Sequence, residues 1–206
     1  MARGGAAREK GRTHRAAEGT MRKIINSTYV SLDGVVENPQ NWTGPYFKDE
    51  AAAYARELLF SCGALLMGRR TFDGFSQAWP AMEESTGDFG VRMNTLPHYV
   101  VSDSLRKPGW GDTTAIRRAD AVAAITRLKE RRGRDILQYG FGPVSRTLVK
   151  HGLLDELRLW VHPVFVGPGD PDDLLTRKGF AASMELADTE VFKTGVIIAT
   201  YVPAAT

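Results

Sequence analysis

Apolar positions divide the chain, from Met21 onward, into a first part of alternating strands and helices and a last part made of strands. Short apolar runs bounded by glycine, proline or polar residues predict strands, and apolar residues three or four positions apart predict helices. Strands are expected at 24–32, 64–67, 98–102, 113–116 and 135–139. Helices are expected at 47–61, 71–79, 121–132 and 143–150. Pro80 is expected to end the second helix, and a polar loop is expected between it and His98.

The C-terminal part changes to the two-residue period of strands. Apolar residues alternate with Arg158, Trp160 and His162 in one long strand over 157–165. Two further strands, 184–192 and 196–202, flank a short turn and predict a hairpin. The whole order predicts an α/β fold: a mixed central sheet with helices on both faces and a C-terminal antiparallel hairpin.

Composition indicates one globular domain over residues 21–206 and a separate tail before it. Of the 206 residues, 43% are hydrophobic and 25% charged, as in ordinary single domains. Residues 1–20 contain no Leu, Ile, Val, Phe, Tyr or Trp, so we expect them to be a disordered basic tail. The chain has 27 Lys and Arg against 24 Asp and Glu; five and two of these lie in the tail, which leaves 22 of each in the domain. We therefore expect no specific nucleic-acid partner, although a basic arm could touch polyanions weakly.

Several classes of protein are disfavoured. No stretch approaches the roughly twenty apolar residues of a membrane span, and the basic N-terminus lacks the apolar core of a secretory signal, so we expect a cytoplasmic protein without membrane contact. Cys62 is the one cysteine in the sequence, which excludes an internal disulfide. The four histidines lack ligand spacing, so no metal site is expected.

The segment 64–75 carries the most specific chemical signal. An apolar run ends at Gly68 and is followed at once by Arg69, Arg70 and Thr71, the pattern of a buried strand that passes directly into a helix. The first N–H groups of a helix lack partners and attract anions, and two guanidinium groups beside them favour a phosphate. The same residues also fit a tight turn with solvated arginines.

A second glycine turn follows the strand at 135–139. Gly140 and Gly142 stand between this strand and a helix that begins at Pro143, where backbone N–H groups can approach a pyrophosphate. Ser145 occupies the place of the third glycine in the dinucleotide fingerprint, so the match to that fingerprint is incomplete. An ordinary turn and helix start is the alternative. Both glycine turns lie at the carboxyl ends of strands, where open α/β sheets bind their ligands.

With these motifs laid out, the chain resembles the dihydrofolate-reductase-like family, most closely the branch related to the reductase domain of bifunctional riboflavin-biosynthesis enzymes. The resemblance extends from about Arg22 to Val202. Its carriers are the segments 31–34 (SLDG), 67–72 (MGRRTF), 99–102 (YVVS), 140–142 (GFG) and 152–157 (GLLDEL), which are specific only in combination. The resemblance implies a dihydrofolate-reductase-like fold and NADPH as the cofactor.

By matching position, the resemblance also implies roles for individual residues. The first turn would hold phosphates of NADPH. The serine that ends the 98–102 strand would lie near the adenosine 2′-phosphate, and the second turn would cover the pyrophosphate. The implied cofactor-binding residues are Gly68, Arg69, Arg70, Thr71, Ser102, Gly140 and Gly142. Asp33, Gly34, Val35 and Val36 would border the nicotinamide.

Asp33 and Asp49 are the candidate catalytic residues, the second because folate-reducing relatives place an acid on their first long helix. Each has an alternative: Asp33 also fits an Asp-Gly turn, and Asp49 with Glu50 also fits the negative charge that favours a helix N-terminus. The segment 41–45 does not match the folate enzymes closely, which disfavours dihydrofolate as the substrate. Asp103 stands where relatives often carry a basic residue, which opposes a preference for NADPH over NADH.

The resulting hypothesis is an NAD(P)H-dependent reductase that transfers hydride to a small heterocyclic substrate, similar to 5-amino-6-(5-phosphoribosylamino)uracil reductase or dihydrofolate reductase. The protein would supply orientation and a dry pocket. A nucleotide-binding module without turnover is the alternative. A homodimer is also expected, since Trp160 and Phe165 look exposed on the late strands and the edge of the hairpin needs a cover.

Overall fold

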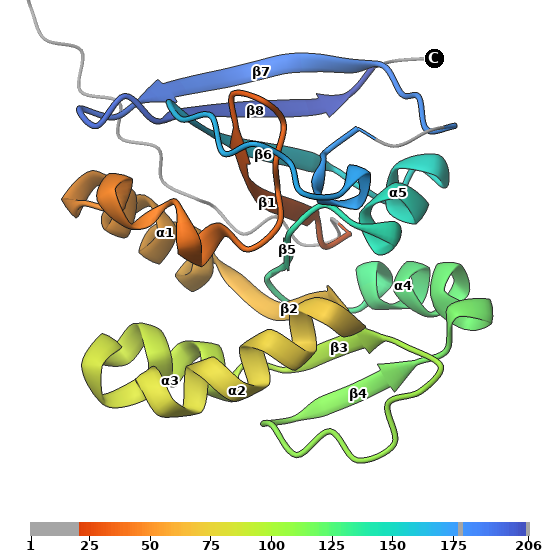
Figure 1. The fold of residues 1–206 in the computed structure, drawn as a ribbon. Helices are drawn as coiled ribbons and strands as arrows, with labels where there is room; N and C mark the ends of the chain where they lie inside the picture. The colour runs from red at the N-terminus through yellow and green to blue at the C-terminus, as the bar shows by residue number, and fades with distance from the viewer. Residues whose placement is uncertain (1–20, 177–178, 205–206) are drawn as a thin grey trace, which may run out of the picture.

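The structure of the chain is a computed structural model that describes residues 21–176 and 179–204 (Figure 1). The expected disordered tail, residues 1–20, lies outside the described residues. Within them, eight strands form one sheet in the order β4-β3-β2-β5-β1-β6-β8-β7. The strands are β1 (Ile24–Ser31), β2 (Cys62–Gly68), β3 (His98–Val101), β4 (Thr113–Ile116), β5 (Asp135–Tyr139), β6 (Glu156–His162), β7 (Met184–Val191) and β8 (Ile197–Pro203).

The six strands from β4 to β6 run parallel, and the β7–β8 hairpin joins β6 in antiparallel pairing. The expected α/β fold with a mixed sheet and a C-terminal hairpin is therefore confirmed. Its helices are α1 (Asp49–Ser61), α2 (Arg69–Thr86), α3 (Asp88–Thr95), α4 (Ala121–Glu130) and α5 (Pro143–Lys150). Short 3₁₀ turns occur at 39–41, 44–46, 118–120 and 171–173.

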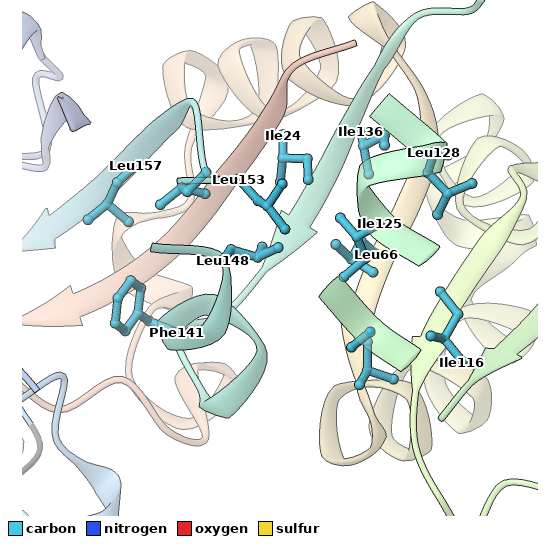
Figure 2. Close-up of a cluster of buried hydrophobic side chains, with 14 residues drawn as sticks. Ile24, Leu66, Ile116, Ile125, Leu128, Ile136, Phe141, Leu148, Leu153 and Leu157 are labelled. Atoms are coloured by element: carbon cyan, nitrogen blue, oxygen red, sulfur yellow. The ribbon is translucent and has the colours of Figure 1, made fainter. Parts of the chain in front are cut away.

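Helices cover both faces of the sheet. Under α4 and α5, a cluster of buried aliphatic side chains centres on Ile24, Leu66, Ile136 and Leu148 (Figure 2). On the opposite face, α1, α2 and α3 bury a second cluster against β2 and β3, and α1 adds a third around Trp160. The strands are apolar on both faces because both are covered, as is usual for a parallel sheet.

The region after Pro80 differs from its expectation as a polar loop. Helix α2 continues through Pro80 to Thr86, and α3 follows after a single residue, Gly87. A proline inside a helix removes one backbone hydrogen bond, which here costs less than unpacking the two helices. Gly90 lets them come close, since a Cβ at Gly90 would lie 2.3 Å from the Thr86 hydroxyl oxygen. Tertiary packing therefore decides this segment.

The late strands also differ in detail. β6 ends at His162, three residues before the expected end, and Trp160 is 1% exposed rather than on the surface. The Trp160 indole packs under α1, with its Nε1–H donated to the Ser27 hydroxyl at 3.0 Å. Phe165 is exposed, as expected.

Candidate functional site

Unequal strand lengths shape the carboxyl edge of the sheet. β5 ends at Tyr139, which pairs with Ser27, whereas β1 continues to Ser31 and is paired beyond Ser27 with β6 alone. The turns that follow β1, β2, β3 and β5 meet along this edge, and we call them the strand-end site: residues 33–37, 68–71, 102–105 and 140–142. Ligands of open α/β sheets bind in this position.

The turn after β2 is built around two arginines with different partners. The Arg69 Nε donates to both carboxylate oxygens of Asp73, at 2.7 and 2.8 Å, and its Nη1 donates to the Ser104 hydroxyl at 3.1 Å. Arg70 reaches instead to the Glu37 carboxylate, 3.3 Å away on the loop that follows β1. The two guanidinium groups therefore sit on opposite sides of the first turn of α2.

A buried polar network holds the turn after β5. The Asn26 side-chain amide donates to Gln138 Oε1 at 2.9 Å and to the Gly140 carbonyl at 2.8 Å. The Ser145 hydroxyl donates to the same carbonyl at 3.0 Å and accepts the Gly142 N–H at 3.2 Å. Gly140 has φ +75°, a backbone conformation that residues with a Cβ atom rarely adopt. Sequence reasoning gave no role to Asn26 and Gln138, whose available signal was a polar side chain near the middle of each of two strands.

The two glycine turns lie against one another. A Cβ atom built on Gly68 would contact Val144 Cγ2 at 3.4 Å, and one on Gly140 would lie 3.9 Å from the Thr71 hydroxyl oxygen. A Cβ on Gly142 would meet nothing within 4 Å. The N-terminal turns of α2 and α5 thus meet beside backbone that carries no side chain, which suits a ligand that contacts main-chain N–H groups.

Ser102 and Asp103 shape the turn after β3. The buried Ser102 hydroxyl accepts the N–H groups of Ser104 and Leu105, both at 3.2 Å, and so stabilises the loop that presents Ser104 to Arg69. Asp103 accepts the Arg118 N–H at 2.9 Å, and its carboxylate lies 3.6 Å from the Arg118 Nε. The expected negative charge of Asp103 is therefore partly offset by an arginine that the sequence places fifteen residues away.

Asp33 binds a loop at the end of β1. Its carboxylate accepts the Ser31 hydroxyl at 2.5 Å and the N–H groups of Val166 and Gly167 at 3.1 and 2.7 Å. These hydrogen bonds, the one from Ser31 foremost, lower the pKa of Asp33 to about 2. These contacts tie the end of β1 to the 166–167 loop, and a catalytic role for Asp33 stays a prediction.

The acids that begin α1 face away from the turns. Asp49 is exposed at the first position of the helix. The Glu50 carboxylate accepts the Lys193 N–H at 2.7 Å, in the hairpin turn between β7 and β8. The inward face of α1 carries Ala51, Ala55 and Leu58 instead. A catalytic role for Asp49 stays a prediction.

Aromatic side chains gather where β1 and β6 end. The His162 ring is buried with Tyr29, Trp42 and Tyr46 packed edge-on around it, at centroid distances of 5.2, 5.2 and 5.7 Å. Burial lowers the pKa of His162, and its Nδ1 hydrogen-bonds with the Trp160 carbonyl at 2.8 Å, so the ring is a neutral packing group.

Neither metal clusters nor membrane-spanning helices occur in the part of the chain that the structure describes. No three His, Cys, Asp or Glu side chains come together there in a way that would hold a metal ion. None of its helices is both long enough and apolar enough to cross a bilayer.

Comparison with known proteins shows the family of the chain. The family model of the RibD C-terminal domain matches residues 22–198. The chain belongs to this family. It is 28% identical over 183 residues to the uncharacterized protein YyaP of Bacillus subtilis, covering 87% of this chain and 94% of that protein. Family membership confirms the resemblance inferred from the motifs.

Solved structures show the same fold. A candidate riboflavin biosynthesis protein from Shewanella sp. PV-4 has a TM-score of 0.62 at 19% identity, with 89% of this chain and 99% of that chain covered. The riboflavin biosynthesis reductase of Saccharomyces cerevisiae has a TM-score of 0.58 at 13% identity, with 92% and 93% covered.

A bifunctional deaminase and 5-amino-6-(5-phosphoribosylamino)uracil reductase from Thermotoga maritima gives a TM-score of 0.61 at 14% identity. There, 89% of this chain matches 57% of the longer protein. The present chain therefore spans just over half the length of that enzyme. At 14% identity, this similarity shows a shared fold and nothing more.

Proposed function

We propose that the protein is an NAD(P)H-dependent reductase that acts on a small heterocyclic substrate, as the reductases of riboflavin biosynthesis do. The observation that carries this proposal is the contact between the two glycine turns, with Thr71 beside Gly140 and Val144 beside Gly68. Two helix N-termini, two guanidinium groups and bare glycine backbone at one sheet edge match the chemistry of a dinucleotide diphosphate.

The residues present fit NADPH. The glycines at 68, 140 and 142 leave the backbone accessible, and Thr71 adds a hydroxyl group. Arg69 and Ser104, on the side of β3, would hold the 2′-phosphate, and Ser102 keeps that loop in place. Arg70, on the side of β1, would meet the pyrophosphate. NADPH supplies the hydride, and the protein supplies its orientation.

The substrate end would lie toward β1 and α1, where the aromatic side chains gather. Asp33, ionised at neutral pH, would fix the backbone of the strand end. Proton donation by a protein carboxylate is therefore assigned to neither Asp33 nor, given its exposed position, Asp49. Substrate protonation by solvent is consistent with this arrangement.

Calorimetric titration with NADPH and NADH tests the proposal directly. We expect micromolar binding of at least one nucleotide, followed by oxidation of NADPH when pyrimidine or pteridine compounds are added. Absence of binding at millimolar nucleotide would refute the proposed function. Binding without turnover over a broad panel of heterocycles would instead support a nucleotide-binding module.

A homodimer is part of the same proposal. β7 is one of the two edge strands of the sheet. One of its faces carries Leu186 and Val191, which are 57% and 69% exposed, next to Ile197 on β8. The other face of β7 carries Glu185, Asp188 and Glu190. An apolar stripe on an uncovered edge strand favours association with a second copy.

A further inference from the structure

Tyr29 and Tyr139 lie next to each other on one face of the sheet, at the point where β5 ends. Tyr139 is the last residue of β5 and pairs with Ser27, and Tyr29 follows two positions further along β1. Side chains two positions apart on a strand point to the same face. Both phenols therefore lie on the face covered by α1, α2 and α3, beside the glycine turn at 140–142.

Aromatic side chains from both sides frame the two phenols. The Tyr29 ring packs edge-on against the Trp160 ring on the side of α1, with 5.1 Å between the ring centroids. The Tyr139 ring packs against the Phe75 ring of α2, with 5.5 Å between the centroids. Phe75 in turn packs against Trp79, with 6.1 Å between the centroids. These rings offer flat apolar surface of the kind that planar ligands occupy.

The two hydroxyl groups are not used by the fold. Neither hydroxyl makes a hydrogen bond to another described residue. Some side-chain nitrogen and oxygen atoms of the described residues are fully buried without a hydrogen-bond partner, and the two phenol oxygens are not among them. Both side chains are half-buried. Tyr54 differs, because its hydroxyl accepts a hydrogen bond from the Arg158 guanidinium at 3.2 Å.

The environment keeps both phenols neutral. Burial raises the pKa of Tyr29 and of Tyr139, and proximity to one another raises the pKa of Tyr139 further. Within the described residues, no carboxylate, guanidinium or ammonium group contributes to either shift. Each hydroxyl therefore keeps its proton and is available as a hydrogen-bond donor.

We propose that the Tyr29 and Tyr139 hydroxyls together donate hydrogen bonds to the carbonyl or ring-nitrogen acceptors of an uncharged, planar heterocycle seated between α1 and α2. This assignment rests on the proposed reductase function and names the substrate-binding groups of that site. In this proposal the two phenols bind the substrate in place of the acid that folate-reducing relatives carry on their first long helix. In this chain, Glu50 of α1 is bound to the hairpin and Asp49 is exposed.

The absence of charged groups beside the two phenols, among the described residues, favours an uncharged substrate ring over a charged one. A charged ring would find no counter-ion beside the two phenols, and burial of an unpaired charge is costly. A uracil-like ring with two carbonyl groups presents two acceptors without a charge. Phosphate groups would be held at the arginine side of the strand-end site.

A binding experiment with 6-(D-ribitylamino)uracil tests the assignment. Its affinity for the NADP⁺-saturated protein is measured for the wild type, Tyr29→Phe, Tyr139→Phe and the double variant. Tyr99→Phe is the matched control, because Tyr99 packs on the opposite face under α4 and α5. We expect each single variant to bind about fivefold more weakly, the worth of one neutral hydrogen bond, and the control to bind as the wild type does.

A second measurement reads the tyrosines themselves. The chain has six tyrosines, and labelling with 3-fluorotyrosine gives each a ¹⁹F resonance that the Phe variants assign. We expect the uracil compound to shift the signals of Tyr29 and Tyr139 and to leave that of Tyr99 in place.

The outcomes separate the two proposals. Loss of NADP⁺ binding by the wild type would refute the reductase function. Normal NADP⁺ binding with no binding of the uracil compound at millimolar concentration overturns the substrate assignment alone. Equal affinity in wild type and both Phe variants, with unmoved ¹⁹F signals, likewise overturns the role of the two phenols.

Discussion

The Arg70 guanidinium lies 3.3 Å from the Glu37 carboxylate, so a single ion pair joins the first turn of α2 to the loop after β1. The Arg70 side chain is 69% exposed and Glu37 is 25% exposed, so the pair contributes little to stability. Its importance lies in competition: if Arg70 binds a cofactor phosphate, Glu37 competes with that phosphate for the same cation.

Replacement of Glu37 tests this competition. Glu37→Gln removes the negative charge, so we expect NADPH to bind about two- to fivefold more tightly, with the melting temperature changed by no more than a few degrees. Isothermal titration provides the affinity, and Glu84→Gln, an exposed change further along α2, is the control. Weaker binding in Glu37→Gln would mean that Glu37 contacts the nucleotide itself.

Arg69 is the second test of the phosphate site. Arg69→Ala should weaken NADPH binding by about 1.5–3 kcal/mol, the usual worth of a hydrogen bond to a charged group. Because Arg69 contacts Ser104 on the side of β3, we expect a smaller loss for NADH, which lacks the 2′-phosphate. Arg56→Ala on α1, where Arg56 pairs with Asp88, should leave both affinities unchanged. If Arg69→Ala weakens NADPH and NADH binding equally, Arg69 contacts the pyrophosphate instead of the 2′-phosphate.

The contact between Asp103 and Arg118 allows a test of the proposed cofactor preference. Asp103→Asn keeps an oxygen that accepts the Arg118 N–H but removes the charge that offsets the Arg118 guanidinium. The preference for NADPH over NADH should rise about two- to fivefold at low salt and shrink as salt increases. The ratio of the two dissociation constants measures this effect. A ratio that does not change would exclude the 2′-phosphate from this turn.

Acid unfolding should report the carboxylate of Asp33. Its pKa is lowered from 3.8 to about 2 in the fold, so the ionised form stabilises the native state above pH 3.8. This contribution declines as the pH falls from 3.8 and is lost below about 2. Asp33→Asn should therefore be less stable than the wild type at neutral pH, and the difference should vanish in strong acid. Urea unfolding at a series of pH values measures it, and a gap that is as large at pH 2 as at neutral pH would contradict the assignment.

The edge strand provides the test of the dimer. Val191→Lys places a charge on the apolar face of β7, and we expect monomers by sedimentation velocity at micromolar concentration. Glu190→Lys changes a charge on the opposite face of the same strand and should leave the dimer intact. A wild-type protein that sediments as a monomer would refute the dimer.

The strands, most helices and both glycine turns could be predicted from the sequence, because each depends on short-range pattern. Gly68 and Gly140 follow apolar runs and precede helical segments, which is enough to place them at strand ends. The helices beyond Pro80 could not be predicted, since they depend on packing between α2 and α3 through Gly90. Trp160 was misplaced on the surface because strand alternation gives two faces without saying which helix covers each.

The site was predictable only in part for a similar reason. A turn sequence names Arg69 and Arg70 but not their partners, and Arg70 finds Glu37 more than thirty residues away. Asp103 looked unfavourable for NADPH until the fold brought Arg118 beside it. Asn26 and Gln138 became meaningful only as a pair, 112 residues apart in the chain.

That separation has a consequence for how the protein is made. β1 leaves the ribosome before both of its partners, since β5 and β6 are synthesised more than a hundred residues later. At about 5–20 residues per second, the 112 residues between Asn26 and Gln138 take roughly 6–22 seconds to add. Throughout that interval a strand buried on both faces in the finished protein has no sheet to join. An unpaired apolar strand is prone to pair with other chains, so we expect β1 to need shielding until β5 and β6 have been made.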